Sequence, residues 1–458
     1  MPSARSPNRR QFLQAGAATA GLTATSAATP ALPAMQESKP NFLFIVCDQL
    51  GLDAISAHGC PDVHTPNIDR LVRRGVTFTE SHSTNPVCSP ARSSLFTGRM
   101  PVETGVISNN RAIHPSCPNL GQWLTAAGYE SYYCGKWHVP EGYPTKIAGF
   151  NVLPVGQGQG DLVDTVVSRW GESFLKSRTS SKPFCFVASL MQPHDICYWA
   201  IQGKQLVPEE LPFGSLADRL PELPPNHKSR PPAPAKLDRL AHDQFSDAQW
   251  RYYLYIYYRQ VEMVDADIGR MLDALEDSGH AENTVVVLTA DHGDGRGRHS
   301  HVQKWYPYEE SVKVPMIVSC PGRVAAGVVD NRHLVTGLDV MCTLSDYAGL
   351  DAPPHSQGRS LRPLLEEKAT VWRDFVSTEH HITGRMLRTE QYKYVRYQGD
   401  PIEQLFDMQA DPWEMTNLYD DPKLADVVRD HRRMLDAWEA SLRPVEPMPE
   451  PSARRKRS

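Results

Sequence analysis

The segment NFLFIVCDQ, residues 41–49, is an uninterrupted apolar run that ends in two polar residues. Such a run predicts a buried parallel strand that delivers polar groups at its carboxyl end. The same pattern returns in KPFCFVASL (182–190) before QPHD (192–195), and in TVVVLTA (284–290) before DHGD (291–294). Because ligands of parallel sheets bind beyond the carboxyl ends of the strands, we expect the functional site where these polar clusters meet.

Helical patterns lie between and after these runs, at residues 65–74, 119–127, 163–175, 247–277 and 339–348. Strands that alternate with helices predict an α/β fold in which helices sandwich a large, mixed, mostly parallel sheet. The aromatic residues of the longest helix, between Tyr252 and Tyr258, are interpreted as packing residues.

The pattern changes after Pro353-Pro354, where short strands are expected at 374–378, 385–389, 392–397 and 404–407. A final amphipathic helix is expected between residues 422 and 442, which completes a small C-terminal antiparallel sheet with one covering helix. Eight prolines between Pro208 and Pro234 exclude a core element there. That segment is either a linker or a wall of the site.

The composition excludes several classes of protein. The chain has 458 residues and a formal charge of −5, so no global positive field attracts nucleic acid. Its apolar runs are far shorter than the roughly 20 residues that a membrane helix needs, so we expect no transmembrane span in the mature protein. Residues 446–458 include the basic run Arg454–Arg457 and are expected to form a disordered tail.

The N-terminus predicts an export signal over residues 1–34. Arg9-Arg10 precedes a weakly apolar, uncharged stretch rich in alanine, which is typical of a twin-arginine signal. The alternative is a chance arginine pair before a disordered tail. Export would make this a periplasmic or secreted bacterial protein, with the twin-arginine translocase as a partner. Since that pathway exports folded cargo, any modification of a buried residue must precede transport.

Nine cysteines are present, and no two of them have the C-x-x-C spacing of a zinc or redox motif. Cys47, Cys185 and Cys320 lie in apolar runs and are interpreted as buried hydrophobic residues. Cys88 lies in a different context.

The segment PVCSPARSSLFTGR, residues 86–99, contains the pattern C-x-P-x-R followed by T-G-R. With TPNIDRL (65–71), GKWH (135–138), YEES (308–311) and the C-terminal LFD (405–407), it resembles the type I, formylglycine-dependent sulfatases of the alkaline-phosphatase superfamily. The resemblance covers residues 41 to about 420. It implies an alkaline-phosphatase-like fold, a catalytic domain over 38–350 and a C-terminal subdomain over 351–445. Without the motif, Cys88 would be read as a partly buried free thiol.

In that family the cysteine is oxidised to formylglycine by a formylglycine-generating or maturase enzyme. The hydrated aldehyde attacks sulfur with one hydroxyl, and its second hydroxyl allows sulfate to be ejected. The resemblance implies one divalent metal held by Asp48, Gln49, Asp291, His292 and the modified Cys88. Calcium is the expected ion, and the nitrogen of His292 admits manganese or zinc.

The resemblance also assigns the cationic residues. Arg92 would hold the nucleophile and the metal ligands, Lys136 would bind sulfate, and His138 would move a proton on the diol. His194 and Lys304 would lie at the leaving-group oxygen. Outside the motif, His194 would be read as structural and Lys304 as a surface charge. Arg296, Arg298, His299 and His301 are candidates for a second anionic group on the substrate, or form a solvated basic loop.

The expected activity is therefore hydrolysis of a sulfate ester, with a sulfated carbohydrate as the expected substrate. Gln49 and His292 depart from many relatives, which carry Asp and Asn there, and resemble choline sulfatases and phosphonate monoester hydrolases. The alternatives are consequently a phosphodiesterase or phosphonate monoester hydrolase, and a non-catalytic protein that binds sulfated glycans.

Overall fold

The computed structural model describes residues 39–201, 214–238, 245–368, 370–380 and 383–449. The predicted export signal and the basic run at residues 454–457 lie outside the described residues. Of the helices in the described ranges, none combines the length and the apolar character needed to cross a membrane. The sheets described below belong to one unit that begins at Lys39.

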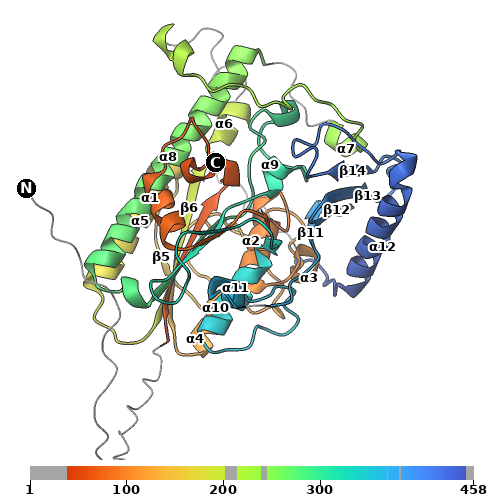
Figure 1. Cartoon of the computed structure of the whole chain (residues 1–458). Helices are drawn as coiled ribbons and strands as arrows, with labels where there is room; N and C mark the ends of the chain where they lie inside the picture. Colours follow the sequence, from red (N-terminus) through yellow and green to blue (C-terminus); the bar gives the residue numbers. More distant parts are fainter. Residues whose placement is uncertain (1–38, 202–213, 239–244, 369, 381–382, 450–458) are drawn as a thin grey trace, which may run out of the picture. The chain divides into compact units, whose positions relative to one another are not determined.

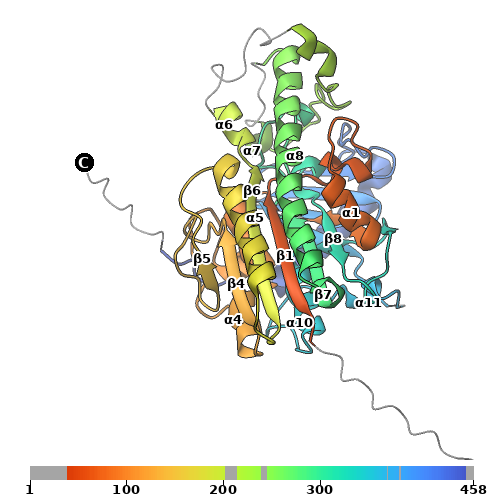
Figure 2. The ribbon, with the colours of Figure 1, turned by 90° about the vertical axis from the view of Figure 1, so that its left-hand side faces the viewer.

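The central sheet has eight strands in the order β5-β4-β6-β1-β7-β8-β2-β9. Figure 2 labels the strands from β5 to β8 in this order. All neighbours pair in parallel except β8, which runs antiparallel to β7 and β2. The predicted mostly parallel α/β sheet is confirmed. Its strands are β1 (Asn41–Asp48), β2 (Val76–Phe78), β4 (Glu130–Gly135), β5 (Asn151–Leu153), β6 (Phe184–Pro193), β7 (Thr284–Ala290), β8 (Met316–Ser319) and β9 (Val328–Asp330). A separate pair consists of β3 (Ser81–His82) and β10 (Val335–Thr336).

Helices cover both faces of this sheet, because the side chains of a strand alternate between the faces. Leu43 and Ile45 of β1 pack in one core with α5 and α8, which lie over the sheet, roughly along its strands, in Figure 2. Phe42 and Phe44 pack in a second core on the opposite face, with α2, α4 and α10. The helices are α1 (Pro66–Arg74), α2 (Cys88–Thr97), α3 (Pro101–Thr104), α4 (Leu120–Ala126), α5 (Gly160–Ser177), α6 (Ile196–Ile201), α7 (Ala235–Asp238), α8 (Asp247–Asp277), α9 (Glu309–Val312), α10 (Leu338–Tyr347) and α11 (Arg362–Leu365).

The C-terminal part is an antiparallel sheet of four strands with one covering helix, as predicted (Figure 1). Its strands are β11 (Phe375–His380), β12 (Gly384–Thr389), β13 (Tyr392–Tyr397) and β14 (Gln404–Asp407), and its helix is α12 (Ala425–Ser441). One face packs Leu387 and Tyr394 against Val428 and Leu435 of α12. The other face packs against residues 306–312 of the larger part, so apolar contacts join the small sheet to that part.

A buried carboxyl group, Glu379 on β11, lies where this sheet meets α3. Its side chain is 1% exposed, and its Oε2 accepts a hydrogen bond of 3.2 Å from the backbone N–H of Val102. Burial raises the pKa of Glu379 to about 8, although the charge of Arg385 opposes that rise. The side chain is therefore protonated in the folded protein at neutral pH.

We expect Glu379→Gln to flatten the dependence of the unfolding free energy on pH between about pH 5 and 8. In the unfolded chain this carboxyl titrates near pH 4.3, so the native state binds one extra proton between about pH 4.3 and 8. The stabilisation is complete below that window and is lost as the pH rises through about 8. Urea unfolding between pH 5 and 8 should show wild type losing on the order of 1 kcal/mol per pH unit more than the variant. Equal slopes would contradict this assignment.

Candidate active site

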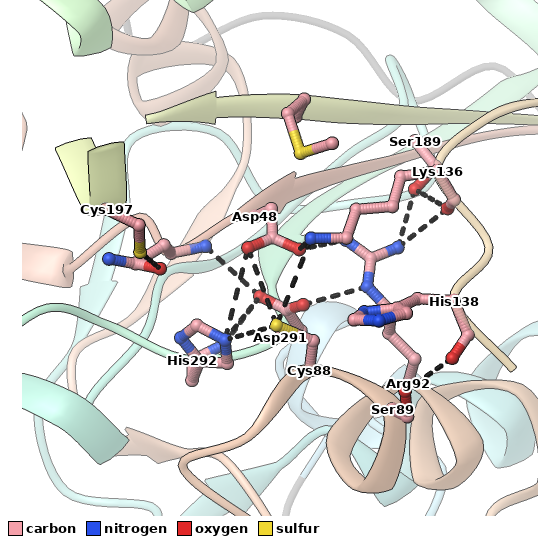
Figure 3. A network of polar contacts seen from close by, with 12 residues as sticks. Asp48, Cys88, Ser89, Arg92, Lys136, His138, Ser189, Cys197, Asp291 and His292 are labelled. Carbon is pink, nitrogen blue, oxygen red and sulfur yellow. Dashed lines mark hydrogen bonds and ion pairs between the residues drawn. The ribbon is translucent and has the colours of Figure 1, made fainter. Parts of the chain in front are cut away.

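Cys88 opens α2 and lies at the centre of a buried polar cluster (Figure 3). Its sulfur is 3.1 Å from Nε2 of His292, 3.8 Å from Oδ1 of Asp48 and 3.9 Å from Nζ of Lys136. The three partners lie at the ends of β7, β1 and β4 or directly after them. The parallel order of the sheet thus brings together residues that are far apart in the chain, as the strand pattern predicts.

Asp48 and Asp291 face each other because β1 and β7 are hydrogen-bonded neighbours, with Cys47 paired to Ala290. Ligand atoms of Asp48, Cys88, Asp291 and His292 all lie within 4.8 Å of one another. Nδ1 of His292 lies 2.9 Å from the carbonyl of Gly293, which assigns the ring proton to Nδ1 and leaves the lone pair of Nε2 directed at the cluster. This donor set fits a divalent cation, because it offers two carboxylates and one imidazole nitrogen, with the side chain of residue 88 as a further ligand.

Arg92 joins the two carboxylates from one turn along α2. Its Nε donates to Oδ2 of Asp291 at 2.8 Å and its Nη2 donates to Oδ2 of Asp48 at 3.0 Å, with all three side chains fully buried. The planar guanidinium can hold two carboxylates at a fixed angle, which a lysine cannot do. Nη1 of Arg92 also donates to the carbonyl of Lys136 at 2.9 Å.

The charges in this cluster favour an anion at residue 88. Burial and Asp48 oppose ionisation of the Cys88 thiol, yet Lys136 and Lys304 lower its pKa well below the ordinary value. Burial and the charge of Asp48 raise the pKa of Asp291 to about 6. The two carboxylates therefore repel each other in a site that excludes water. A bound cation would relieve this repulsion, which is a further reason for the cluster to hold one.

The predicted cationic residues converge on the same place. Nζ of Lys136 is 2.6 Å from Oδ2 of Asp48, and Nζ of Lys304 donates to Oε1 of Gln49 at 2.6 Å. Burial, followed by the charges of Lys136 and Lys304, lowers the pKa of His194 to about 4, so its ring is neutral at pH 7. His138 has a φ of 61°, and its carbonyl accepts a hydrogen bond from Ser89. Ser89 thereby supports the strained backbone at His138.

Sequence reasoning missed several supporting residues. Oγ of Ser189 donates to the carbonyl of Lys136 at 2.6 Å, and the hydroxyl of Tyr133 donates to the same carbonyl at 2.6 Å. A serine inside the apolar run 182–190 was a signal that could have found Ser189. Asp294 belongs to the polar cluster 291–294 that the sequence places at a strand end. Tyr253, whose contacts are described below, gave no comparable signal, because it lies on a helix that the sequence does not connect to that loop.

The four residues predicted to contact a second anionic group take other partners. Nη1 of Arg296 is 2.5 Å from Asp53, and Arg298 pairs with Asp53 and lies 4.5 Å from the ring centre of Trp413. His299 and His301 are buried, and each stacks at 4.3 Å between ring centres, on Tyr308 and Tyr306 respectively.

Arg296 and Arg298 line a pocket of about 700 Å³ together with Asp53, Tyr258 and Trp413. Residues 222–225 of the proline-rich segment line the same pocket. This described part of the segment therefore walls a pocket rather than serving only as a linker.

A family model described as sulfatase matches residues 40–350, which is more than half of the chain. The chain belongs to the sulfatase family. The family lies within the alkaline-phosphatase superfamily, so the predicted resemblance is confirmed. A second model, described as the C-terminal part of N-sulphoglucosamine sulphohydrolase, matches residues 297–441 of this sulfatase.

Characterised relatives match nearly the whole sulfatase chain. A Δ4,5-hexuronate-2-O-sulfatase of Bacteroides thetaiotaomicron is 32% identical over 440 residues, which cover 88% of this chain and 90% of the relative. An N-acetylglucosamine-6-O-sulfatase of the same organism is 26% identical, and the match covers 93% of this chain and 91% of the relative. The solved structure of a 2-O GAG sulfatase is similar with a TM-score of 0.77 and 29% identity, covering 89% of this chain and 95% of that chain.

The phosphonate monoester hydrolase of Agrobacterium radiobacter shares the fold of this sulfatase. Its TM-score is 0.75 at 22% identity, and the match covers 88% of this chain and 95% of that chain. At this identity the likeness concerns the fold alone.

Proposed function

We propose that this sulfatase removes a sulfate ester from a sulfated carbohydrate, with residue 88 as the nucleophile. The observation that carries the proposal is the position of the Cys88 side chain, between two carboxylates and within reach of Lys136 and His292. The carbohydrate substrate is supported by relatives named for a hexuronate 2-O-sulfate and an N-acetylglucosamine 6-O-sulfate.

The nucleophile requires a modification of Cys88 to formylglycine, whose hydrate supplies one hydroxyl for attack and a second for release of sulfate. A divalent cation, calcium by first expectation and manganese or zinc as alternatives, would be held by Asp48, Gln49, Asp291, His292 and residue 88, and would supply Lewis-acid stabilisation of negative charge. Arg92 keeps both aspartates in place for this. His138 is proposed to move a proton at the hydroxyl of residue 88.

Lys136, His194 and Lys304 are proposed to act at the two ends of the scissile bond. Lys136 binds an oxygen of the sulfuryl group, because its Nζ is next to Cys88. His194 is neutral and presents one N–H, which can donate to the leaving oxygen, while the ammonium of Lys304 contributes positive charge beside it. Arg298 is retained as a candidate contact for a distal anionic substituent, because it lines the 700 Å³ pocket.

The wider biology of the chain is proposed from its sequence. We propose export through the twin-arginine translocase to the periplasm or beyond, with residues 1–34 as the signal, and maturation by a formylglycine-generating enzyme before transport. The division into a catalytic domain over 38–350 and a subdomain over 351–445 is part of the same proposal.

The competing function is hydrolysis of phosphate diesters or phosphonate monoesters, which Gln49 and His292 favour. We expect purified, modified protein to release sulfate from 2-O- or 6-O-sulfated mono- and oligosaccharides at least about a hundredfold faster, by kcat/KM, than it cleaves an aryl phosphate diester or phosphonate. The reverse ranking would establish the competing function.

Peptide mass spectrometry tests the nucleophile separately. Conversion of Cys88 to formylglycine lowers the mass of its peptide by about 18 Da. Fully active protein with an unmodified peptide would exclude the proposed nucleophile. Protein that is fully modified but binds sulfated glycans without turnover would favour a glycan-binding function instead.

A further inference from the structure

The side chain of Gln49 lies between an acid and a base inside the site. Its Nε2 donates to Oδ2 of Asp294 at 2.6 Å, and its Oε1 accepts from Nζ of Lys304 at 2.6 Å. Gln49 and Asp294 are fully buried, and Lys304 is 4% exposed. This chain of three side chains links a carboxylate that the reaction does not use to an ammonium group at the leaving-group side.

Asp294 is itself held by two donors. The hydroxyl of Tyr253 on α8 donates to its carboxylate at 3.1 Å, and the backbone N–H of Arg296 donates to Oδ1 at 2.8 Å. The same hydroxyl of Tyr253 accepts the backbone N–H of Gln303 at 3.2 Å, next to Lys304. Tyr253 therefore ties both ends of the 294–304 loop to the long helix.

An ionised carboxylate can only accept hydrogen bonds, whereas a glutamine amide has a distinct donor end and acceptor end. With Asp294 on one side, only one orientation of Gln49 satisfies both neighbours: the amide nitrogen points to Asp294 and the oxygen to Lys304. The backbone of Gln49 is constrained as well, with a φ of 75° and its carbonyl accepting from Tyr257 at 2.8 Å. The orientation of one amide thus decides whether Lys304 meets an acceptor or a competing donor.

We propose that Asp294, supported by Tyr253, is a positioning residue that fixes the amide of Gln49 and thereby holds the ammonium of Lys304 in the active site. Gln49 presents an acceptor to Lys304, so the positive charge of that side chain is anchored in place. That charge is then available to an oxygen that becomes negative in the transition state. This inference rests on the proposed sulfatase mechanism for its kinetic effect, but its structural part does not.

A double-mutant cycle tests the proposal. Asp294→Asn supplies a donor as well as an acceptor, so the amide of Gln49 can turn and present its N–H groups to Lys304. We expect kcat to fall about tenfold to hundredfold, with KM changed less than about threefold. Gln49→Glu places a second carboxylate against Asp294 and should lose a similar amount. In the double variant the net charge is restored, and the two equivalent oxygens of the carboxylate introduced at position 49 can accept from both the amide introduced at position 294 and Lys304. We expect it to be at least about tenfold faster than either single variant.

Two further variants calibrate the cycle. Tyr253→Phe removes one donor to Asp294 and should reduce kcat by less than Asp294→Asn does. Asp267→Asn alters another aspartate of limited exposure on α8, which accepts from Ser168 at 2.6 Å, and should leave kcat within about twofold of wild type. A merely structural role for Asp294 predicts that the double variant is as slow as the slower single variant, and that result would overturn the proposal.

Crystal structures of the wild type and of Asp294→Asn provide a readout that needs no turnover. We expect Nζ of Lys304 to lie within hydrogen-bond distance of Gln49 in the wild type and to move away from it in the variant. An unmoved Lys304 in Asp294→Asn would overturn the proposal. Wild-type protein with this geometry that hydrolyses no sulfate ester would instead contradict the proposed function alone.

Discussion

Replacing Cys88 with alanine is expected to abolish sulfate release, with kcat reduced by at least about four orders of magnitude. Alanine keeps the β-carbon but lacks the thiol that is oxidised to formylglycine, so no attacking hydroxyl can form, and Lys136, Arg92 and His292 stay in place. Binding of a sulfated saccharide should consequently survive, since those charges still face the ester. Turnover measured by ion chromatography of sulfate, together with calorimetric titration of the substrate, separates the two effects.

Cys342→Ala provides the matched control, because Cys342 is also buried and helical but lies on α10. We expect it to turn over substrate within about twofold of wild type. Cys88→Ser adds a sharper test, because a plain alcohol has no second hydroxyl with which to eject sulfate. A single turnover should leave a stable sulfate ester at residue 88, seen as a gain of about 80 Da. Turnover by Cys88→Ala at a rate comparable to that of the wild type would exclude residue 88 as the nucleophile.

The fold was predictable wherever the sequence carries a strong local pattern. The run at 284–290 matches β7 and the periodic segment 247–277 matches α8 at both ends. The strands β2 and β9, of three residues each, were not predicted, since so short a segment contains no measurable periodicity. The reversed direction of β8 was equally hidden, because strand direction depends on partners that are distant in the chain.

The site was predictable to the extent that it follows strand ends and motifs. Asp48, Asp291 and His292 lie at the ends of β1 and β7, and Cys88 and Arg92 share one helix face, so their approach could be anticipated. The side-chain partners of Gln49 could not, because Asp294 and Lys304 reach it from a loop more than 200 residues away, and Tyr253 supports Asp294 from a helix. Likewise, the loop charges Arg296 and Arg298 looked available for substrate, and only the structure reveals their pairing with Asp53.

Replacing Arg92 with methionine is expected to lower both stability and activity more than any surface charge could. The guanidinium is the direct partner of Asp48 and Asp291, and all three groups are shielded from water. Removing one member of a buried ionic group typically costs about 3–5 kcal/mol, because charges are left uncompensated in a dry interior. Urea unfolding in the presence of a chelator isolates this term from that of any bound cation.

Arg169→Met is the matched control, because Arg169 pairs with Glu172 at 3.0 Å but keeps 60% of its side chain exposed. Exposed pairs contribute less than about 1 kcal/mol, so its unfolding midpoint should barely move. Arg92→Lys separates charge from geometry: it restores one positive charge but cannot reach both carboxylates in the same plane, so stability should recover further than kcat does. If Arg92→Met unfolded at the wild-type midpoint, Asp48 and Asp291 could not both be ionised in the folded protein. That result would contradict a cation site built from two carboxylates.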